Sequence, residues 1–148
     1  MPKVSVIIPT YNYGQYIEKA IDSVLAQSYK DFEIIVVDDG STDNTGTIIE
    51  TKYKDKVKYI FQENKGAAAA RNRAAKEAKG KYLSFLDADD TFLVDNLQKK
   101  LRSWKQTQQQ AWSILTDIIS WGTVSGSRLS ISCPLPGQSF TVKSFLCF

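Results

Sequence analysis

Apolar runs typical of buried strands alternate with helical segments over residues 3–104, and this alternation constrains the fold more than any other feature. The apolar runs are "KVSVIIP" (3–9), "DFEIIVVDD" (31–39), "KVKYIFQEN" (56–64) and "KYLSFLDADD" (81–90). Helical patterns cover residues 15–29, the segment from "GSTDNT" to residue 53, residues 66–80 and residues 92–104. We expect Gly80 to be the C-cap of the third helix. Strands that alternate with helices favour parallel pairing through right-handed crossovers. We therefore predict an α/β domain with a Rossmann-like, mostly parallel sheet flanked by helices.

Each predicted strand ends in a polar cluster. These clusters are "PTYN", "DDGSTD", "QENKG" and "DADD". The carboxyl ends of parallel strands lie at one edge of the sheet, and ligands of such sheets bind outside that edge. The sequence therefore predicts one ligand site at this edge.

Composition excludes several other kinds of site. The chain has 148 residues, a net charge of +3 and no histidine, which excludes histidine-based triads and moves any metal site toward oxygen ligands. The charge suits an anionic small ligand and is too low to indicate nucleic acid. With no apolar stretch near the ~18 residues of a membrane span, we expect a cytoplasmic protein whose Cys133 and Cys147 are free thiols.

Three carboxylates, Asp87, Asp89 and Asp90, follow the fourth strand within four positions. One reading is a helix N-terminus, where Asp is favoured. The other is a Mg²⁺ or Mn²⁺ site, because clustered carboxylates require a compensating cation. Asp87 and Asp89 have D-x-D spacing, and two residues along an extended chain point the same way. We expect them to hold the metal together with a ligand's phosphates.

Asp38 and Asp39 end the second strand, where neighbouring side chains point to opposite faces. At most one of them should therefore face a ligand directly, while the other caps the "GSTD" turn. Arg71, near the start of the Ala-rich helix, either approaches the ligand or lies on a solvated surface, as we expect for Arg73 and Lys76.

Tyr11 and Tyr13 lie in the first loop after a strand. Either ring could stack on a planar base, or it could simply cover the core. The residues alone leave both readings open.

Four motifs in order resemble family 2 glycosyltransferases with the GT-A fold: "VSVIIPTYN", "IIVVDDGSTDNT", "ENKGAAAARN" and "GKYLSFLDADD". The resemblance covers residues 3–105 and implies binding of a nucleoside diphosphate sugar, often UDP-linked. It also implies transfer of the sugar to an acceptor with inversion. Bacterial surface polysaccharide synthesis is the commonest setting of the family.

The resemblance also assigns residues. It implies that Pro9 and Tyr11 line the base pocket, with Tyr11 stacked on the base. Asp39 would accept a hydrogen bond from the base, and Arg71 would approach the nucleotide.

In the same resemblance, Asp87 contacts the ribose or the metal, and Asp89 holds the divalent cation. The family's general base, an acidic residue further downstream, has no clear counterpart. Asp95 falls in the helix after D-x-D, and Asp117 is only a weak candidate. We therefore expect the acceptor half to be truncated.

Charge also divides the chain. Of 19 basic and 16 acidic residues, only Asp117, Arg128 and Lys143 fall in 108–148. We expect a donor-binding region at 1–107 and an incomplete or divergent acceptor-side region at 108–148, with strands at 113–121 and 127–133. Partners by analogy are a sugar or lipid-linked acceptor, a second copy of the chain and a peripheral membrane contact.

Two alternative functions follow from the same residues. A non-catalytic nucleotide-sugar-binding remnant would explain the missing base. A receiver-type signalling domain would use Asp38, Asp39, Asp87 and Lys143, but receivers carry the acidic pair on the first strand.

Overall fold

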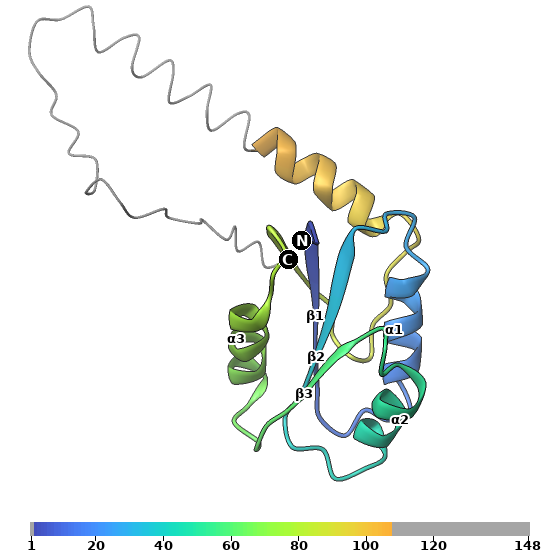
Figure 1. Cartoon of the computed structure of the whole chain (residues 1–148), viewed down its shortest axis with the longest axis vertical. Helices are drawn as coiled ribbons and strands as arrows, with labels where there is room; N and C mark the ends of the chain where they lie inside the picture. The colour runs from blue at the N-terminus through green and yellow to red at the C-terminus, as the bar shows by residue number, and fades with distance from the viewer. Residues whose placement is uncertain (1, 108–148) are drawn as a thin grey trace, which may run out of the picture. The chain divides into compact units, whose positions relative to one another are not determined.

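The computed structural model describes residues 2–107, and its centre is a sheet of four parallel strands in the order β3-β2-β1-β4 (Figure 1). The elements in chain order are β1 Val4–Thr10, α1 Ile17–Leu25, β2 Phe32–Asp38, α2 Thr45–Lys52, β3 Lys58–Phe61, α3 Ala67–Glu77 and β4 Tyr82–Phe85. The predicted α/β architecture is thus confirmed. Residues 96–107 are also helical, and a second compact unit begins at residue 98.

The two central strands are buried on both faces. All seven residues of β1 are buried, and β1 pairs with β2 along its full length from Val4 opposite Phe32 to Thr10 opposite Asp38. Val and Ile predominate in both strands and occupy both faces of the sheet, as expected for parallel strands that are covered on each side. This register brings the ends of β1 and β2 to the same level.

Helices cover both faces of the sheet, with α3 on one side and α1 and α2 on the other (Figure 1). Ile7, Ile35 and Val37 pack against Ala70 and Ala74 of α3. The opposite helix α1 buries a stripe at helical spacing, namely Ile17, Ala20, Ile21 and Val24. Because alanine side chains are small, α3 lies close to the sheet where the strands end.

Several predicted boundaries are wrong by a few residues. The fourth strand ends at Phe85, and the acidic run forms a turn in which the Asp90 amide donates to the Asp87 carbonyl at 3.0 Å. Asp favours turns because its side chain competes with the strand for backbone hydrogen bonds. The expectation that Asp87 and Asp89 extend from one straight strand is therefore corrected.

The helix expected over 66–80 ends at Glu77, with Ala78 as its C-cap. Gly80 has a different role from the predicted cap. A Cβ there would lie 2.5 Å from the Ser5 amide nitrogen, so glycine is required by the close approach of two backbones. Its own amide donates to Ser5 Oγ at 2.8 Å.

Some predictions fall on residues outside the described range. They are the strands at 113–121 and 127–133, the candidate base Asp117, Lys143 and both cysteines. Among residues 2–107, no helix has the length and hydropathy needed to cross a membrane.

Candidate functional site

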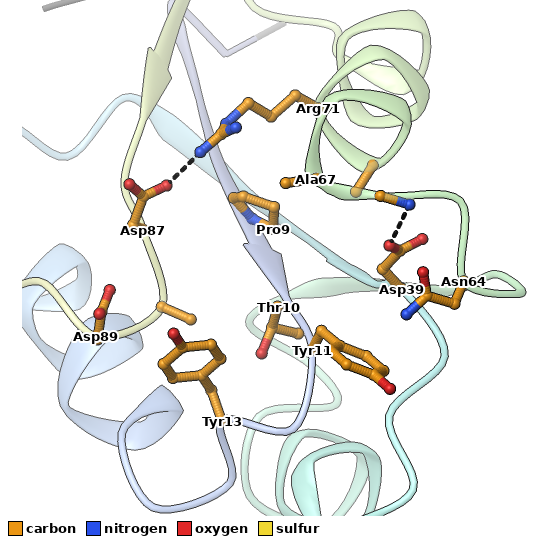
Figure 2. A pocket seen from close by; sticks show the side chains of 13 residues that line it. Pro9, Thr10, Tyr11, Tyr13, Asp39, Asn64, Ala67, Arg71, Asp87 and Asp89 are labelled. Carbon is orange, nitrogen blue, oxygen red and sulfur yellow. Dashed lines mark hydrogen bonds and ion pairs between the residues drawn. The ribbon is translucent and has the colours of Figure 1, made fainter.

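A pocket of about 420 Å³ opens where the strands end, and all six side chains predicted for the ligand site line it (Figure 2). The predicted residues are Pro9, Tyr11, Asp39, Arg71, Asp87 and Asp89. They come from β1, the end of β2, α3 and the turn after β4. The topology thus gathers at one place residues that are up to eighty positions apart in the sequence.

Asp38 and Asp39 point to opposite faces of the sheet, as the strand period predicts. Asp38 Oδ1 accepts from the Ser41 amide at 2.8 Å, and Asp38 Oδ2 accepts from the Tyr59 hydroxyl at 2.8 Å. Burial, and then the hydrogen bond to Asp38, raise the pKa of Tyr59 well above its ordinary value. Asp38 therefore holds the turn after β2, and only Asp39 lines the pocket.

Asp39 is 4% exposed, yet its carboxylate is well compensated. It accepts from Gln62 Nε2 at 2.7 Å and from the amides of Lys65 and Gly66 at 2.9 and 2.8 Å. Burial by itself would raise the pKa of Asp39, but these hydrogen bonds together lower it below the ordinary value. A carboxylate offers about four acceptor positions, so the charged group can still accept from a ligand.

Arg71 supplies the cation next to the acidic turn. Its Nη2 lies 2.7 Å from Asp87 Oδ1 (Figure 2), and the two side chains are 37% and 54% exposed. Asp89 is exposed, whereas Ala88 between the two carboxylates is buried and anchors the turn. The pair links α3 to the turn after β4 across the pocket.

The possible metal ligands in the pocket are Asp87 and Asp89. Among residues 2–107 no three His, Cys, Asp or Glu side chains come together as a metal cluster. Two carboxylates nevertheless fit a Mg²⁺ or Mn²⁺ ion that takes its other ligands from phosphates and water. A set of oxygen donors is the kind of ligand that such hard cations prefer.

The two tyrosines of the first loop stand at the pocket wall. Tyr11 is 45% exposed and Tyr13 36% exposed, so each ring has a face available to a ligand. Tyr13 also contacts Tyr16, with ring centroids 5.9 Å apart and planes tilted by 51°. Both residues line the pocket, so their position agrees with the prediction that a ring stacks on a ligand.

Sequence reasoning missed part of the lining, namely Thr10, Asn64, Gly66, Ala67, Ala70 and Ala88. Alanines carry no chemical signal of binding, although their small size is what leaves space beside Pro9. Gly66, with φ of +86°, precedes α3 and presents its amide to Asp39. Thr10 Oγ1 is buried without a hydrogen-bond partner among residues 2–107, an unusual state that a bound ligand could relieve.

A family comparison assigns this pocket to a class of protein. The model of "Glycosyl transferase family 2" matches residues 5–143. The chain belongs to this family. The match also decides against the receiver-domain alternative, and it agrees with the motif resemblance in the sequence.

Curated relatives align with about two thirds of this chain. TuaG of Bacillus subtilis, a putative teichuronic acid biosynthesis glycosyltransferase, is 47% identical over 103 residues, which are 68% of this chain and 41% of TuaG. An uncharacterized glycosyltransferase of Rickettsia felis is 48% identical over 101 residues, 68% of this chain and 17% of the relative. The chain thus spans well under half the length of these relatives.

Solved structures share the fold. S. aureus TarS 1–349 in complex with UDP-GlcNAc matches with a TM-score of 0.60 and 37% identity, over 68% of this chain and 30% of TarS 1–349. Mannosyltransferase PcManGT from Pyrobaculum calidifontis, in complex with GDP-Man and Mn²⁺, matches with a TM-score of 0.57 and 35% identity, over 62% of this chain and 28% of that protein. The GT-A fold class is therefore confirmed.

Proposed function

We propose that residues 2–107 form the donor site of a metal-dependent glycosyltransferase that binds a nucleoside diphosphate sugar. We propose further that it prefers UDP-sugars to sugars linked to other nucleotides. The observation that carries the proposal is the pocket itself. The Tyr11 ring and the buried carboxylate of Asp39 lie toward one side of it, and Asp87 and Asp89 lie toward the other, with the Arg71 guanidinium beside Asp87 (Figure 2).

The base would bind at the side of Tyr11 and Asp39. Tyr11 has an exposed ring face for stacking. Asp39 is held as an anion by Gln62 and two backbone amides, so it can accept a hydrogen bond from a base N–H group. Pro9 forms the apolar wall between these groups and α3. UDP and UDP-GlcNAc in complexes of the TarS neighbour support the preference for uracil.

The diphosphate would bind at the side of Arg71, Asp87 and Asp89. Asp87 and Asp89 would hold Mg²⁺ or Mn²⁺, which would neutralise charge on the departing nucleotide. Arg71 carries a guanidinium that suits phosphate or ribose oxygens. The Mn²⁺ in the PcManGT complex supports a divalent ion in this fold.

Transfer also needs a group that accepts the proton of the acceptor hydroxyl. Among residues 2–107, the only carboxylates that line the pocket are Asp39, Asp87 and Asp89, and the roles above use all three. The described residues therefore leave no pocket carboxylate to act as the general base of an inverting transfer. The acceptor would be a sugar or a lipid-linked molecule of polysaccharide biosynthesis. The alternative to an enzyme is a non-catalytic protein that binds the nucleotide sugar without transferring it.

Calorimetry of the full chain tests the donor site. UDP, GDP and ADP are titrated in Mn²⁺ and in EDTA, with Asp89→Asn beside Asp90→Asn. Asp90 is exposed and lies outside the pocket lining, so its variant is a matched control for charge. We expect metal-dependent binding with UDP preferred, lost for the most part in Asp89→Asn and kept in Asp90→Asn.

Equal affinity in Mn²⁺ and EDTA would overturn the metal assignment. Equal affinity for the three nucleotides would overturn the base assignment. A transfer assay on the same samples separates the enzyme from the non-catalytic alternative, which would bind UDP without turnover.

A further inference from the structure

We propose that hydrogen bonds between the loop at 41–44 and the loop after β1 form a clamp that positions Tyr11 and Tyr13 in the pocket. Its two positioning residues are Asn12, in the loop after β1, and Asp43, in the loop at 41–44. The inference rests on the proposed function for its ligand, since the clamp would set the affinity for the nucleoside part of the donor. It assigns a role to the "GSTDN" segment, none of whose residues lines the pocket.

Asn12 stands between the two tyrosines and is bound on both of its sides. Its Oδ1 accepts from the Thr42 amide at 2.8 Å and from the Asp43 amide at 3.3 Å. Its own backbone amide donates to Ser41 Oγ at 2.8 Å. The loop after β1 is therefore attached to the loop after β2 at the residue that separates Tyr11 from Tyr13.

Asp43 completes the attachment from the other loop. Its Oδ2 accepts from the Gly14 amide at 3.0 Å, and its Oδ1 accepts from the Thr45 amide at 2.9 Å at the start of α2. The carboxylate thus joins the first loop to a helix packed on the sheet. A Cβ at Gly14 would lie 2.1 Å from Asn44 Oδ1, so the loops are also in close contact here.

The backbone at Asn12 shows why a clamp is needed. Its φ is +57°, a left-handed conformation that costs most residues free energy and that Asn tolerates best after Gly. The turn at Asn12 lies between Tyr11 and Tyr13, and both of these tyrosines line the pocket. Since the two residues are 45% and 36% exposed, packing holds them only in part, and the hydrogen bonds of the loop add to it.

The experiment separates positioning from folding with two variants of Asn12 and one control outside both loops. Asn12→Gly accepts positive φ but removes Oδ1, whereas Asn12→Asp keeps an oxygen acceptor and also tolerates positive φ. The control is Thr47→Ala, which shortens an exposed side chain on α2. Each full-length variant is titrated with UDP and with inorganic pyrophosphate in Mn²⁺. Its melting temperature is recorded in parallel.

We expect Asn12→Gly to weaken UDP binding by about tenfold, which is part of the stacking contribution of one base, and to leave pyrophosphate binding unchanged. Asn12→Asp should recover part of the loss, and Thr47→Ala should bind like the wild type. Equal weakening of UDP and pyrophosphate, or no weakening of UDP, would overturn the clamp.

A measurement without ligand keeps the clamp testable if the proposed function fails. The protein is labelled with fluorotyrosine, and the resonances of Tyr11 and Tyr13 are assigned with Phe variants. We expect both resonances to shift and narrow in Asn12→Gly, because the loop is released, and to be unchanged in Thr47→Ala. Unchanged resonances in Asn12→Gly would overturn the clamp whether or not the wild type binds UDP.

Discussion

Arg71 and Asp87 form an ion pair with each other, and under the proposed function each also has a ligand partner. For Arg71 this partner is the diphosphate of the donor, and for Asp87 it is the metal ion. Arg71 Nη2 forms an ion pair with Asp87 Oδ1 at 2.7 Å, and both side chains are partly exposed. Such pairs contribute little net free energy, about 0–1 kcal/mol, because water screens them. A metal ion and a diphosphate can therefore separate the pair at low cost, the metal taking Asp87 and the diphosphate taking Arg71.

This competition predicts opposite effects on two ligands. In Arg71→Gln, Mn²⁺ alone should bind more tightly, by at least about fivefold, because the guanidinium repels the ion and even two unit charges about 4 Å apart in water interact by about 1 kcal/mol. UDP in Mn²⁺ should bind more weakly, because its phosphates lose a cation. Titration of Mn²⁺ followed by electron paramagnetic resonance, and calorimetry of UDP, measure the two effects.

Arg73→Gln is the control, because Arg73 lies on the same helix, is exposed and is not part of the pocket lining. It should leave both affinities unchanged. If Arg71→Gln binds Mn²⁺ no better than the wild type, the ion pair does not compete with the metal.

At the residue scale, what could be predicted followed from backbone periodicity. The two-residue period separated Asp38 from Asp39, and the polar strand ends predicted one site at this edge of the sheet. Pro9 and the role of Arg71 came from the resemblance to the family motifs. The partner of Asp87 was not predictable, because it depends on the helical phase of Arg71 relative to a turn formed sixteen residues later. Thr10 was missed because a hydroxyl inside an apolar strand gives no sign of whether it finds a partner.

At the scale of elements, the connection from α3 to β4 depends on a network at the other end of the strands. Glu33 Oε1 accepts from the Lys79 amide at 2.7 Å and from the Gly80 amide at 3.2 Å. Ser5 Oγ donates to the same carboxylate and accepts from the Gly80 amide. These contacts join β1, β2 and the start of β4, and they set where β4 begins.

Gly80→Ala should therefore destabilise the fold without changing the pocket chemistry. The added Cβ would meet the Ser5 amide at 2.5 Å and the carbonyl carbon of Val4 at 2.7 Å, and both are backbone atoms that cannot move independently. The expected loss in the free energy of unfolding is about 1–3 kcal/mol, measured by urea denaturation.

Lys79→Ala is the matched control, because Lys79 is exposed and contributes only its backbone amide to the network. Its effect should remain within about 0.5 kcal/mol. A Gly80→Ala protein as stable as the control would show that the two backbones can separate freely. The sequence suggested a helix cap at Gly80 because a capping glycine and a close-packing glycine look alike without the neighbouring strand.

At the scale of the molecule, two carboxylates that follow β2 connect the loops around the pocket. Asp39 binds the loop between β3 and α3, and Asp43 binds the loop between β1 and α1. The alternation of strands and helices predicted which loops would meet at this edge. It could not predict these bonds, which depend on loop conformations such as the positive φ at Asn12, Gly40 and Gly66.

These carboxylates predict how stability depends on pH. At both, burial acts to raise the pKa but hydrogen bonds lower it below the ordinary value of 3.8. A lowered folded-state pKa means that the unfolded chain binds protons first as the pH falls. Their contribution is therefore complete above the unfolded value and is lost as the pH falls from that value through the folded one.

We expect the free energy of unfolding of the wild type to fall steeply as the pH drops below about 4.5, near the ordinary range of a carboxyl group. Asp43→Asn removes one of the two titrating groups, so its stability should be lower at pH 6 and should approach that of the wild type at pH 3. Asp55→Asn, which removes an exposed carboxylate, is the control and should follow the wild-type profile. Urea denaturation at pH 3 to 6 measures all three proteins. A constant difference between Asp43→Asn and the wild type across this range would mean that Asp43 joins the loops by its shape alone, and that its charge contributes nothing to the stability of the pocket edge.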